Sequence, residues 1–503
     1  MIIDIHTHVW SHDEQDIRER LVRECRRSGV ALAFVSSVGD GDQDPSLEKI
    51  RRANAQAAEV VAQAGQRLRW LAYLNPRHAS WREELAWCRA HGAIGIKLWV
   101  SLKDEHGRLE ATVAVLDAAA EQQLPALIHT FNRTDPNLPG EIDIEEFAAL
   151  AERVPRAVVI GAHAGANWRH SLGVLRHRAP NAHVDVSGIY PQRGIVRALV
   201  DDIGAERILF GSDGLNRSLP SQIAKVVFAD ITAEQKEQIL WQNAARLFRL
   251  EDLAAAPDPE PELRPATELP DPTVDHFCFC GRWPFFETPC ATPADLEQEL
   301  GAHGIAQAFV GDLGSIYRLD LARANRAFGA ACAGCRRIAP LAVVNPRAHN
   351  WRQVLAAVDA GSAGVIVYPC LHDWRLDDPA FAPFFQACAA GARPVWINAA
   401  LDDDRFRHSG VARRGVRDGE VAAFVQAAPS NRYVFQGVAG AAIMDCIRTR
   451  PDPARFRFEI SRLTDATGLL DRAVTANGLP WLVMGSEFPL RDSGEVWWTA
   501  QRQ

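Results

Sequence analysis

The chain alternates between short apolar runs and longer stretches of mixed polarity. In its first half, eight runs rich in aliphatic and β-branched residues predict strands, at residues 1–5, 31–36, 68–74, 94–99, 126–129, 158–162, 182–186 and 208–211. The segments between them, such as 46–64 and 81–91, have the length and the Ala, Leu and Arg content of helices. Successive β-then-α units of this kind predict a closed parallel barrel rather than an open doubly wound sheet.

The alternation stops over residues 253–272, which read LAAAPDPEPELRPATELPDP. Proline, glutamate and alanine dominate this stretch and it has no apolar periodicity, so it predicts a linker. The linker separates segments 1–252 and 273–503, each close to the roughly 250 residues of a β/α barrel.

The two segments also match one another in order. Asn-Pro-Arg at 75–77 recurs at 345–347, and Leu-Phe-Gly-Ser at 209–212 corresponds to Val-Met-Gly-Ser at 483–486. Ordered matches of this kind indicate an internal duplication. We therefore expect an α/β protein built of two tandem (β/α)8 TIM-like barrels.

The composition is that of a globular protein, because 47% of the 503 residues are hydrophobic and 23% are charged. A net charge of -8 provides no basic surface for nucleic acid or an anionic membrane, and the expected partner is a small-molecule substrate. No signal-peptide pattern precedes the first strand, and no uninterrupted apolar run reaches about 18 residues. We therefore expect a cytoplasmic protein whose ten cysteines are reduced.

Polar side chains cluster where the predicted strands of the first barrel end. The first strand leads into His6 and His8, and later strands carry or lead into Lys97, His129, His163 and Asp213. Histidines at i and i+2 of a strand lie on one face. Active sites of barrels are built at this end of the strands, and imidazole and carboxylate groups suit zinc or another divalent first-row metal. Such an ion activates water and polarises a carbon–oxygen or carbon–nitrogen centre.

Five of these motifs, in order and at barrel spacing, resemble those of a known family: residues 3–8, 95–98, 128–130, 162–165 and 209–213. The first segment is similar to the amidohydrolase superfamily. Within it, the motifs resemble the amidohydrolase-related branch that includes aminocarboxymuconate-semialdehyde decarboxylase and γ-resorcylate decarboxylase. The resemblance extends from residue 1 to about residue 250.

The resemblance implies roles for the rim residues. His6, His8, His129 and Asp213 would hold a divalent metal, Asp213 would also shuttle a proton, and His163 would be the general acid or base. In binuclear relatives a carboxylated lysine and the strand-6 histidine join the ligands, so Lys97 and His163 leave a second metal open. We favour one metal, with Zn²⁺ expected first and Mn²⁺ or Fe²⁺ as alternatives.

Substrate contacts are expected from residues that follow the rim positions directly in sequence: Trp10, Trp99, Asn132, Arg133, Asn167, Trp168 and Arg217. Arg133 and Arg217 suit a substrate carboxylate, because a guanidinium pairs with it through two hydrogen bonds.

The second segment has lost nearly all of the ligand set. At the positions of His6, His8, Lys97, His129, His163 and Asp213 it carries Phe277, Phe279, Ile366, Asn398, Val438 and Glu487. Cys278 and Cys280 are expected on the opposite strand face from the two phenylalanines. We therefore predict a degenerate, pseudo-catalytic barrel, whose last helix is missing or replaced because the chain stops soon after Glu487.

The leading functional hypothesis is a metal-dependent hydrolase of an amide, lactone or ester-like bond in a small carboxylated metabolite. A non-oxidative metal-dependent decarboxylase using the same ligands is the alternative. A third hypothesis is a non-catalytic partner or scaffold protein, which absence of bound metal in the purified protein would favour. We expect the two barrels to pack on one another within the chain, and a homo-oligomer stays open.

Overall fold

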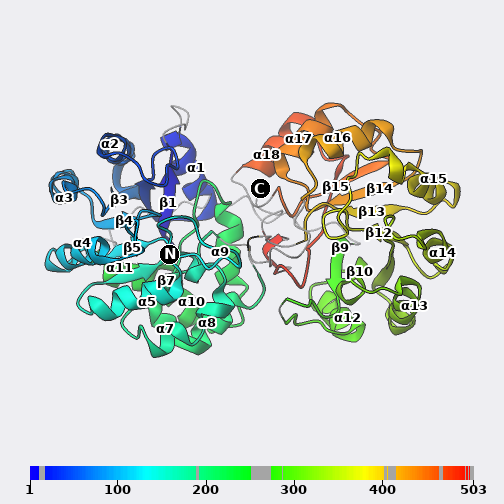
Figure 1. Cartoon of the computed structure of the whole chain (residues 1–503), viewed down its shortest axis with the longest axis horizontal. Helices are drawn as coiled ribbons and strands as arrows, with labels where there is room; N and C mark the ends of the chain where they lie inside the picture. Colours follow the sequence, from blue (N-terminus) through cyan, green and yellow to red (C-terminus); the bar gives the residue numbers. More distant parts are fainter. Residues whose placement is uncertain are drawn as a thin grey trace. The chain divides into compact units, whose positions relative to one another are not determined.

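The computed structural model describes residues 1–10, 17–188, 192–250, 273–285, 287–401, 405, 415–463, 468–492, 494–496 and 498. The chain divides into two compact units, with the boundary after Ala266 (Figure 1). The predicted linker at 253–272 lies entirely outside the described residues.

The first unit contains an eight-stranded parallel sheet in which each strand pairs with the next along the chain. The strands are β1 Ile3–Val9, β2 Leu32–Ser37, β3 Leu68–Leu74, β4 Gly95–Leu98, β5 Ala126–Ile128, β6 Val159–Gly161, β7 His183–Asp185 and β8 Ile208–Leu209. Backbone bonds join β1 to the segment after β8, with Ile5 N donating to Phe210 O at 3.1 Å and Asp213 N to His6 O at 2.7 Å. These bonds bring the first strand beside the last and close the barrel.

Helices surround this sheet, as the predicted alternation requires (Figure 1). They are α1 Ile17–Ser28, α2 Leu47–Gln63, α3 Trp81–Ala90, α4 Glu110–Glu121, α5 Ile144–Arg153, α6 Trp168–Ser171, α7 Val174–His177, α8 Ile195–Ile203, α9 Leu219–Val227, α10 Ala233–Glu237 and α11 Asn243–Leu247. The first turn of α2 is capped by Ser46, whose side chain accepts from Lys49 N, and Ala64 ends the helix. A capping box of Asp143 and Glu146 begins α5.

The second unit repeats this architecture. Its strands, again paired in parallel and in chain order, are β9 Val274–Cys280, β10 Gln307–Asp312, β11 Ile338–Val343, β12 Gly364–Val367, β13 Val395–Asn398, β14 Tyr433–Gln436, β15 Phe456–Glu459 and β16 Leu482–Val483. Its helices are α12 Pro293–Ala302, α13 Leu321–Cys332, α14 Trp351–Ala356, α15 Ala382–Ala390, α16 Asp418–Ala427, α17 Gly440–Arg448 and α18 Leu469–Asn477. The prediction of two tandem β/α barrels is confirmed.

A buried aspartate joins the first strand to the last in both barrels. Asp4 Oδ1 accepts from Ser212 N at 3.0 Å and from His6 N at 3.1 Å. Asp275 Oδ1 accepts from Ser486 N at 3.0 Å and from Phe277 N at 3.0 Å. The duplication therefore extends to individual hydrogen bonds at the point where each barrel closes.

The side chains of β9 divide between two cores. Phe277 and Phe279 belong to the larger apolar cluster of the second barrel. Cys278 and Cys280 pack with Leu296 of α12, in a separate cluster. The two cysteines thus lie on the opposite face from the phenylalanines, as the strand register predicts.

The prediction about the last helix of the second barrel falls partly on residues 493, 497 and 499–503, which lie outside the described residues. Among the described residues, no helix is long and apolar enough to cross a membrane.

Candidate metal centre

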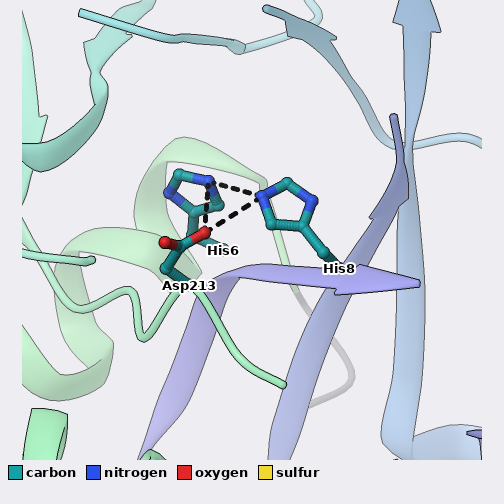
Figure 2. Close-up of side chains that lie close together, drawn as sticks. All are labelled: His6, His8 and Asp213. Carbon is teal, nitrogen blue, oxygen red and sulfur yellow. Dashed lines mark hydrogen bonds and ion pairs between the residues drawn. The ribbon is translucent and has the colours of Figure 1, made fainter. Parts of the chain in front are cut away.

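Three side chains converge at the carboxyl end of the first barrel (Figure 2). His6 and His8 project from β1, and Asp213 comes from the segment after β8. The Nε2 atoms of His6 and His8 are 3.1 Å apart, and Asp213 Oδ1 lies 3.3 Å from His8 Nε2 and 3.9 Å from His6 Nε2. The predicted same-face placement of the two histidines therefore brings both to one point.

The hydrogen bonds of the two imidazoles fix which nitrogen carries the proton. His6 Nδ1 lies 2.7 Å from Asp185 Oδ2, and His8 Nδ1 lies 3.2 Å from Ser36 O. Both partners are acceptors, so each Nδ1 donates and each Nε2 presents a lone pair. Burial, with the nearby Lys97, lowers the pKa of His6 to about 4, so this imidazole is neutral.

Two imidazole lone pairs and a carboxylate oxygen thus face a common point. Burial would raise the pKa of Asp213, but the neighbouring His8 and His163 hold that pKa well below its usual value. Electron-rich atoms this close repel one another unless positive charge lies nearby, and Lys97 Nζ, 2.7 Å from His6 Nε2, supplies part of that charge here. Ligands 2.0–2.1 Å from a tetrahedral Zn²⁺ are roughly 3.4 Å apart, which fits the three observed separations. The residues present therefore fit a divalent ion.

Asp185 contacts two of the predicted site residues, and the sequence interpretation did not select it. This fully buried carboxylate ends β7, and its Oδ1 accepts from His163 N at 2.8 Å while Oδ2 holds His6. Burial opposes its charge, but His6 and Ser187 hold its pKa well below the ordinary value. A carboxylate beyond the ligand shell commonly orients a metal-binding histidine in this way. The available signal was a carboxylate at the carboxyl end of the predicted strand 182–186.

His163 follows β6 and has a left-handed backbone, with φ of 61°. Its Nδ1 lies 3.2 Å from Ser187 O, so Nδ1 donates and Nε2 carries the lone pair. Its ring centroid is 5.1 Å from that of His6. Burial holds the pKa of His163 well below its ordinary value, and the group is a neutral base beside the three converging atoms.

Lys97 also reaches this point. Its Nζ lies 2.7 Å from His6 Nε2, and the side chain is buried. Burial lowers the pKa of Lys97 to about 8. The lysine is therefore a donor to the lone pair of His6 here, and the second metal site that it would form with His163 stays a prediction.

His129 and Arg133 share a carboxylate that the sequence interpretation did not select. His129 Nε2 lies 2.9 Å from Glu141 Oε1, and Arg133 Nε donates to Glu141 Oε2 at 2.8 Å. Burial opposes the charge on Glu141, but His129 and Arg133 lower its pKa to about 2. His129 does not join the close group formed by His6, His8 and Asp213, although its ring centroid is 5.2 Å from that of His163. Its role as the fourth ligand, through Nδ1, remains a prediction.

Gly188 fits closely between two site residues. A Cβ at this position would lie 2.6 Å from His163 Nδ1 and 2.8 Å from Asp213 Oδ2, and the residue has φ of +70°. Only glycine meets both constraints without displacing a side chain. Gly188 is therefore part of the site, and the sequence interpretation did not single it out.

Comparison with known families agrees with this geometry, because residues 3–250 match the family model described as Amidohydrolase. The first barrel is an amidohydrolase domain. A comparison with curated proteins finds no match.

The chain is also similar, at low sequence identity, to several solved structures. A putative amidohydrolase from Staphylococcus aureus is 16% identical, with 49% of this chain and 99% of that chain covered and a TM-score of 0.42. A 2,6-dihydroxybenzoate decarboxylase from Rhizobium is 20% identical, with 50% and 98% covered and a TM-score of 0.41. A dihydroxybenzoic acid decarboxylase from Polaromonas sp. JS666, with bound manganese and 2-nitroresorcinol, is also 20% identical, with 50% and 97% covered and a TM-score of 0.41.

Aromatic rings lie beside the centre of the amidohydrolase barrel. The Trp10 ring centroid is 5.9 Å from that of His8 and 6.4 Å from that of Trp99. Phe131 lies 6.4 Å from His163. Two of the predicted substrate contacts, Trp10 and Trp99, are therefore brought together next to His8, a predicted metal ligand.

The other predicted contacts divide by what they touch. Asn132 Oδ1 accepts from Ile144 N and so holds the start of α5. Trp168 Nε1 donates to Gln192 Oε1, and Asn167 N bonds to Gly165 O within the loop after β6. Arg217 N donates to Asp213 O at 3.2 Å, which places its backbone next to a ligand.

The second barrel has no comparable ligand group among its described residues. The rings of Phe277 and Phe279 pack 4.3 Å apart at the former histidine positions. Glu487, at the position of Asp213, has Arg491 Nη1 at 3.8 Å and Arg462 Nε at 4.0 Å from its Oε2. In the second barrel, therefore, the guanidinium groups of Arg491 and Arg462 supply the positive charge that faces Glu487.

Proposed function

We propose that the amidohydrolase barrel is a metal-dependent hydrolase of an amide, lactone or ester-like bond in a small carboxylated metabolite. The observation that carries this proposal is the convergence of two imidazole lone pairs and one carboxylate oxygen, 3.1 to 3.9 Å apart. His6, His8 and Asp213 would hold the ion, with His129 as the fourth ligand. Three imidazole nitrogens and one carboxylate oxygen suit Zn²⁺, and Mn²⁺ or Fe²⁺ accept the same set.

When bound, a divalent ion lowers the pKa of water and polarises a carbonyl group. The protein residues then have to manage protons. His163 is a neutral base with its lone pair on Nε2, so it can accept a proton from water and return it to the leaving group. The ionised Asp213 is a second acceptor at the same point. Asp185 keeps His6 in the tautomer that the site needs.

The substrate carboxylate needs a cation. Arg133 is already paired with Glu141, through Nε at 2.8 Å and Nη2 at 3.3 Å. This pairing weakens the hypothesis that Arg133 binds a carboxylate. Arg217 follows Asp213 closely in the chain, and we assign the carboxylate contact to it.

Non-oxidative decarboxylation is the second candidate, and the aromatic rings beside the centre favour it. Trp10, Trp99 and Phe131 would enclose a flat aromatic acid. In that reaction a protonated His163 would deliver its proton to the carbon that loses carbon dioxide.

The second barrel, without the ligand set, is proposed to act as a scaffold for the first.

The experiment feeds a panel of carboxylated amides, lactones and aromatic acids to the metal-loaded full chain. Released carbon dioxide identifies decarboxylation, and a new carboxylate or amine identifies hydrolysis. The matched variants are His8→Ala, which removes a ligand, and Arg217→Ala, which should mainly raise KM. Activity that persists after chelation or in His8→Ala contradicts both candidates.

A further inference from the structure

A cavity of about 850 Å³ opens at the carboxyl end of the second barrel. It lies between the loops that follow β9 and β10 and the beginning of α13. Its volume is within the roughly 300–1,000 Å³ typical of small-molecule sites, and this end of a barrel is where such sites are built. It does not include the positions that correspond to the metal ligands of the first barrel.

The cavity is lined by three arginines, Arg282, Arg318 and Arg323. Arg318 Nε donates to Gly314 O at 3.2 Å, and the charge of Arg318 also lowers the pKa of Asp312. Three guanidinium groups around one cavity repel one another. An anion placed between them would relieve this repulsion and accept hydrogen bonds from them.

The two carboxylates that line the cavity are occupied by local hydrogen bonds. Asp312 Oδ1 accepts from Gly314 N at 3.0 Å and Oδ2 accepts from the Ser315 hydroxyl. Asp320 Oδ1 accepts from Arg323 N at 3.0 Å and caps α13. Burial raises the pKa of Asp312, whereas its hydrogen bonds with Ser315 and Gly314 N and the charge of Arg318 lower it. The lining therefore contains three arginines and only two carboxylates.

The corresponding loop of the first barrel has the opposite charge. After β2 it carries Asp40, Asp42 and Asp44, and Lys49 pairs with the first two at 3.1 Å and 2.7 Å. The basic cavity is thus a property of the second copy. It is not inherited from the architecture that both barrels share.

One side of the cavity is apolar. Tyr317, Ala324, Ala327 and Phe328 contribute to its lining. Tyr317 is 41% exposed, and its ring stacks at 6.0 Å on that of Trp283. The stacking fixes an aromatic surface beside the guanidinium groups.

We propose that this cavity binds a small organic anion, a carboxylate or phosphate ester carried on an aromatic body. The arginines bind the charged group, and Tyr317 with the α13 side chains contacts the ring. The site is separate from the proposed hydrolytic centre and does not depend on its function. It gives the second barrel a ligand of its own.

The test is calorimetric titration of the full chain with benzoate, phenyl phosphate and inorganic phosphate. We expect phenyl phosphate or benzoate to bind, and the double variant Arg318→Ala/Arg323→Ala to weaken binding at least about tenfold. Arg326→Ala is the matched control, because this exposed arginine lies on α13 outside the cavity and should leave binding unchanged.

Each outcome decides the proposal. Binding that is unchanged in the double variant, or equally lost in Arg326→Ala, overturns the site. No binding of any probe at millimolar concentration also overturns it. Equal affinity for inorganic phosphate and phenyl phosphate overturns the assignment of an aromatic ligand, and a preference for benzoate over phenyl phosphate identifies a carboxylate source.

Discussion

Asp213 and Glu487 follow the last strands of their barrels at corresponding positions, and both have a left-handed backbone, with φ of 63° and 51°. This conformation costs a residue with a side chain roughly 1–2 kcal/mol. In the first barrel it directs a carboxylate to two histidines, and in the second to Arg491 and Arg462. The duplication thus kept the direction of the carboxylate and changed the cation that it faces.

Because only Asp213 faces histidines, we expect the first barrel and not the second to bind a metal ion. We predict one divalent ion per chain, lost in His8→Ala and in Asp213→Ala because each removes one of three converging ligands. Glu487→Gln is the matched control and should retain the ion. Elemental analysis of the purified proteins measures the stoichiometry, and two ions per chain would restore the lysine-bridged alternative.

Replacing Asp185 by asparagine should weaken metal binding without removing a ligand. The carboxylate holds His6 through Nδ1 at 2.7 Å, and loss of such an orienting group costs about 10- to 100-fold in metal affinity. Competition with a chelator measures the change. Asp201→Asn is the control, since Asp201 pairs with Arg197 at the surface. Equal affinities in the two variants would show that Asp185 has no orienting role.

Gly188→Ala should abolish activity while leaving most of the fold intact. The new methyl group would meet both His163 Nδ1 and Asp213 Oδ2. Gly29→Ala separates this effect from backbone strain, because Gly29 has a similar φ of +73° and nothing within 4 Å of the added Cβ. We expect both variants to lose about 1 kcal/mol of stability. Only Gly188→Ala should lose metal and turnover, and an active Gly188→Ala enzyme would contradict this account of the site.

Asp275 should make the stability of the second barrel depend on pH. Burial raises its pKa from 3.8 to about 6, so the folded state favours the protonated carboxyl group. Its contribution is therefore complete below pH about 4 and is lost as pH rises through 6. In Asp275→Asn this dependence disappears. The stability of the wild-type chain relative to the variant should fall by about 3 kcal/mol across this window, as urea unfolding at several pH values would measure. A difference that is constant with pH contradicts the prediction.

Local patterns predicted most of the fold. The helix expected at 46–64 became α2 with Ser46 and Ala64 as its caps, because a serine side chain and an apolar periodicity act within a few residues. The first strand was expected to end at residue 5, but β1 extends to Val9. Its polar residues stay in the strand because His8 pairs with Ser36 of β2, a contact that no local signal contains.

The candidate site shows the same contrast between local sequence signals and contacts made by distant segments. His6 and His8 could be predicted together because a strand fixes residues i and i+2 on one face. Asp185 lies 179 residues from His6, and the sequence does not specify which distant carboxylate will meet its Nδ1. Glu141 neutralises Arg133 from eight residues away, across an irregular loop. Predicted ligands on a regular strand could therefore be identified from the sequence. The residues that orient or neutralise site side chains, Asp185 and Glu141, could not, because their contacts depend on tertiary structure.

The joining of β1 to the segment after β8 also bears on how the protein matures. The seven strands β2 to β8 lie between His8 and Asp213 in the chain, so they are synthesised before Asp213. A nascent chain therefore cannot assemble His6, His8 and Asp213 until the barrel is able to close. An ion bound there afterwards would connect two segments about 200 residues apart and act as a clasp, since a ligand that binds only the closed form stabilises it. Metal supply during synthesis would then influence how much of the enzyme survives to maturity.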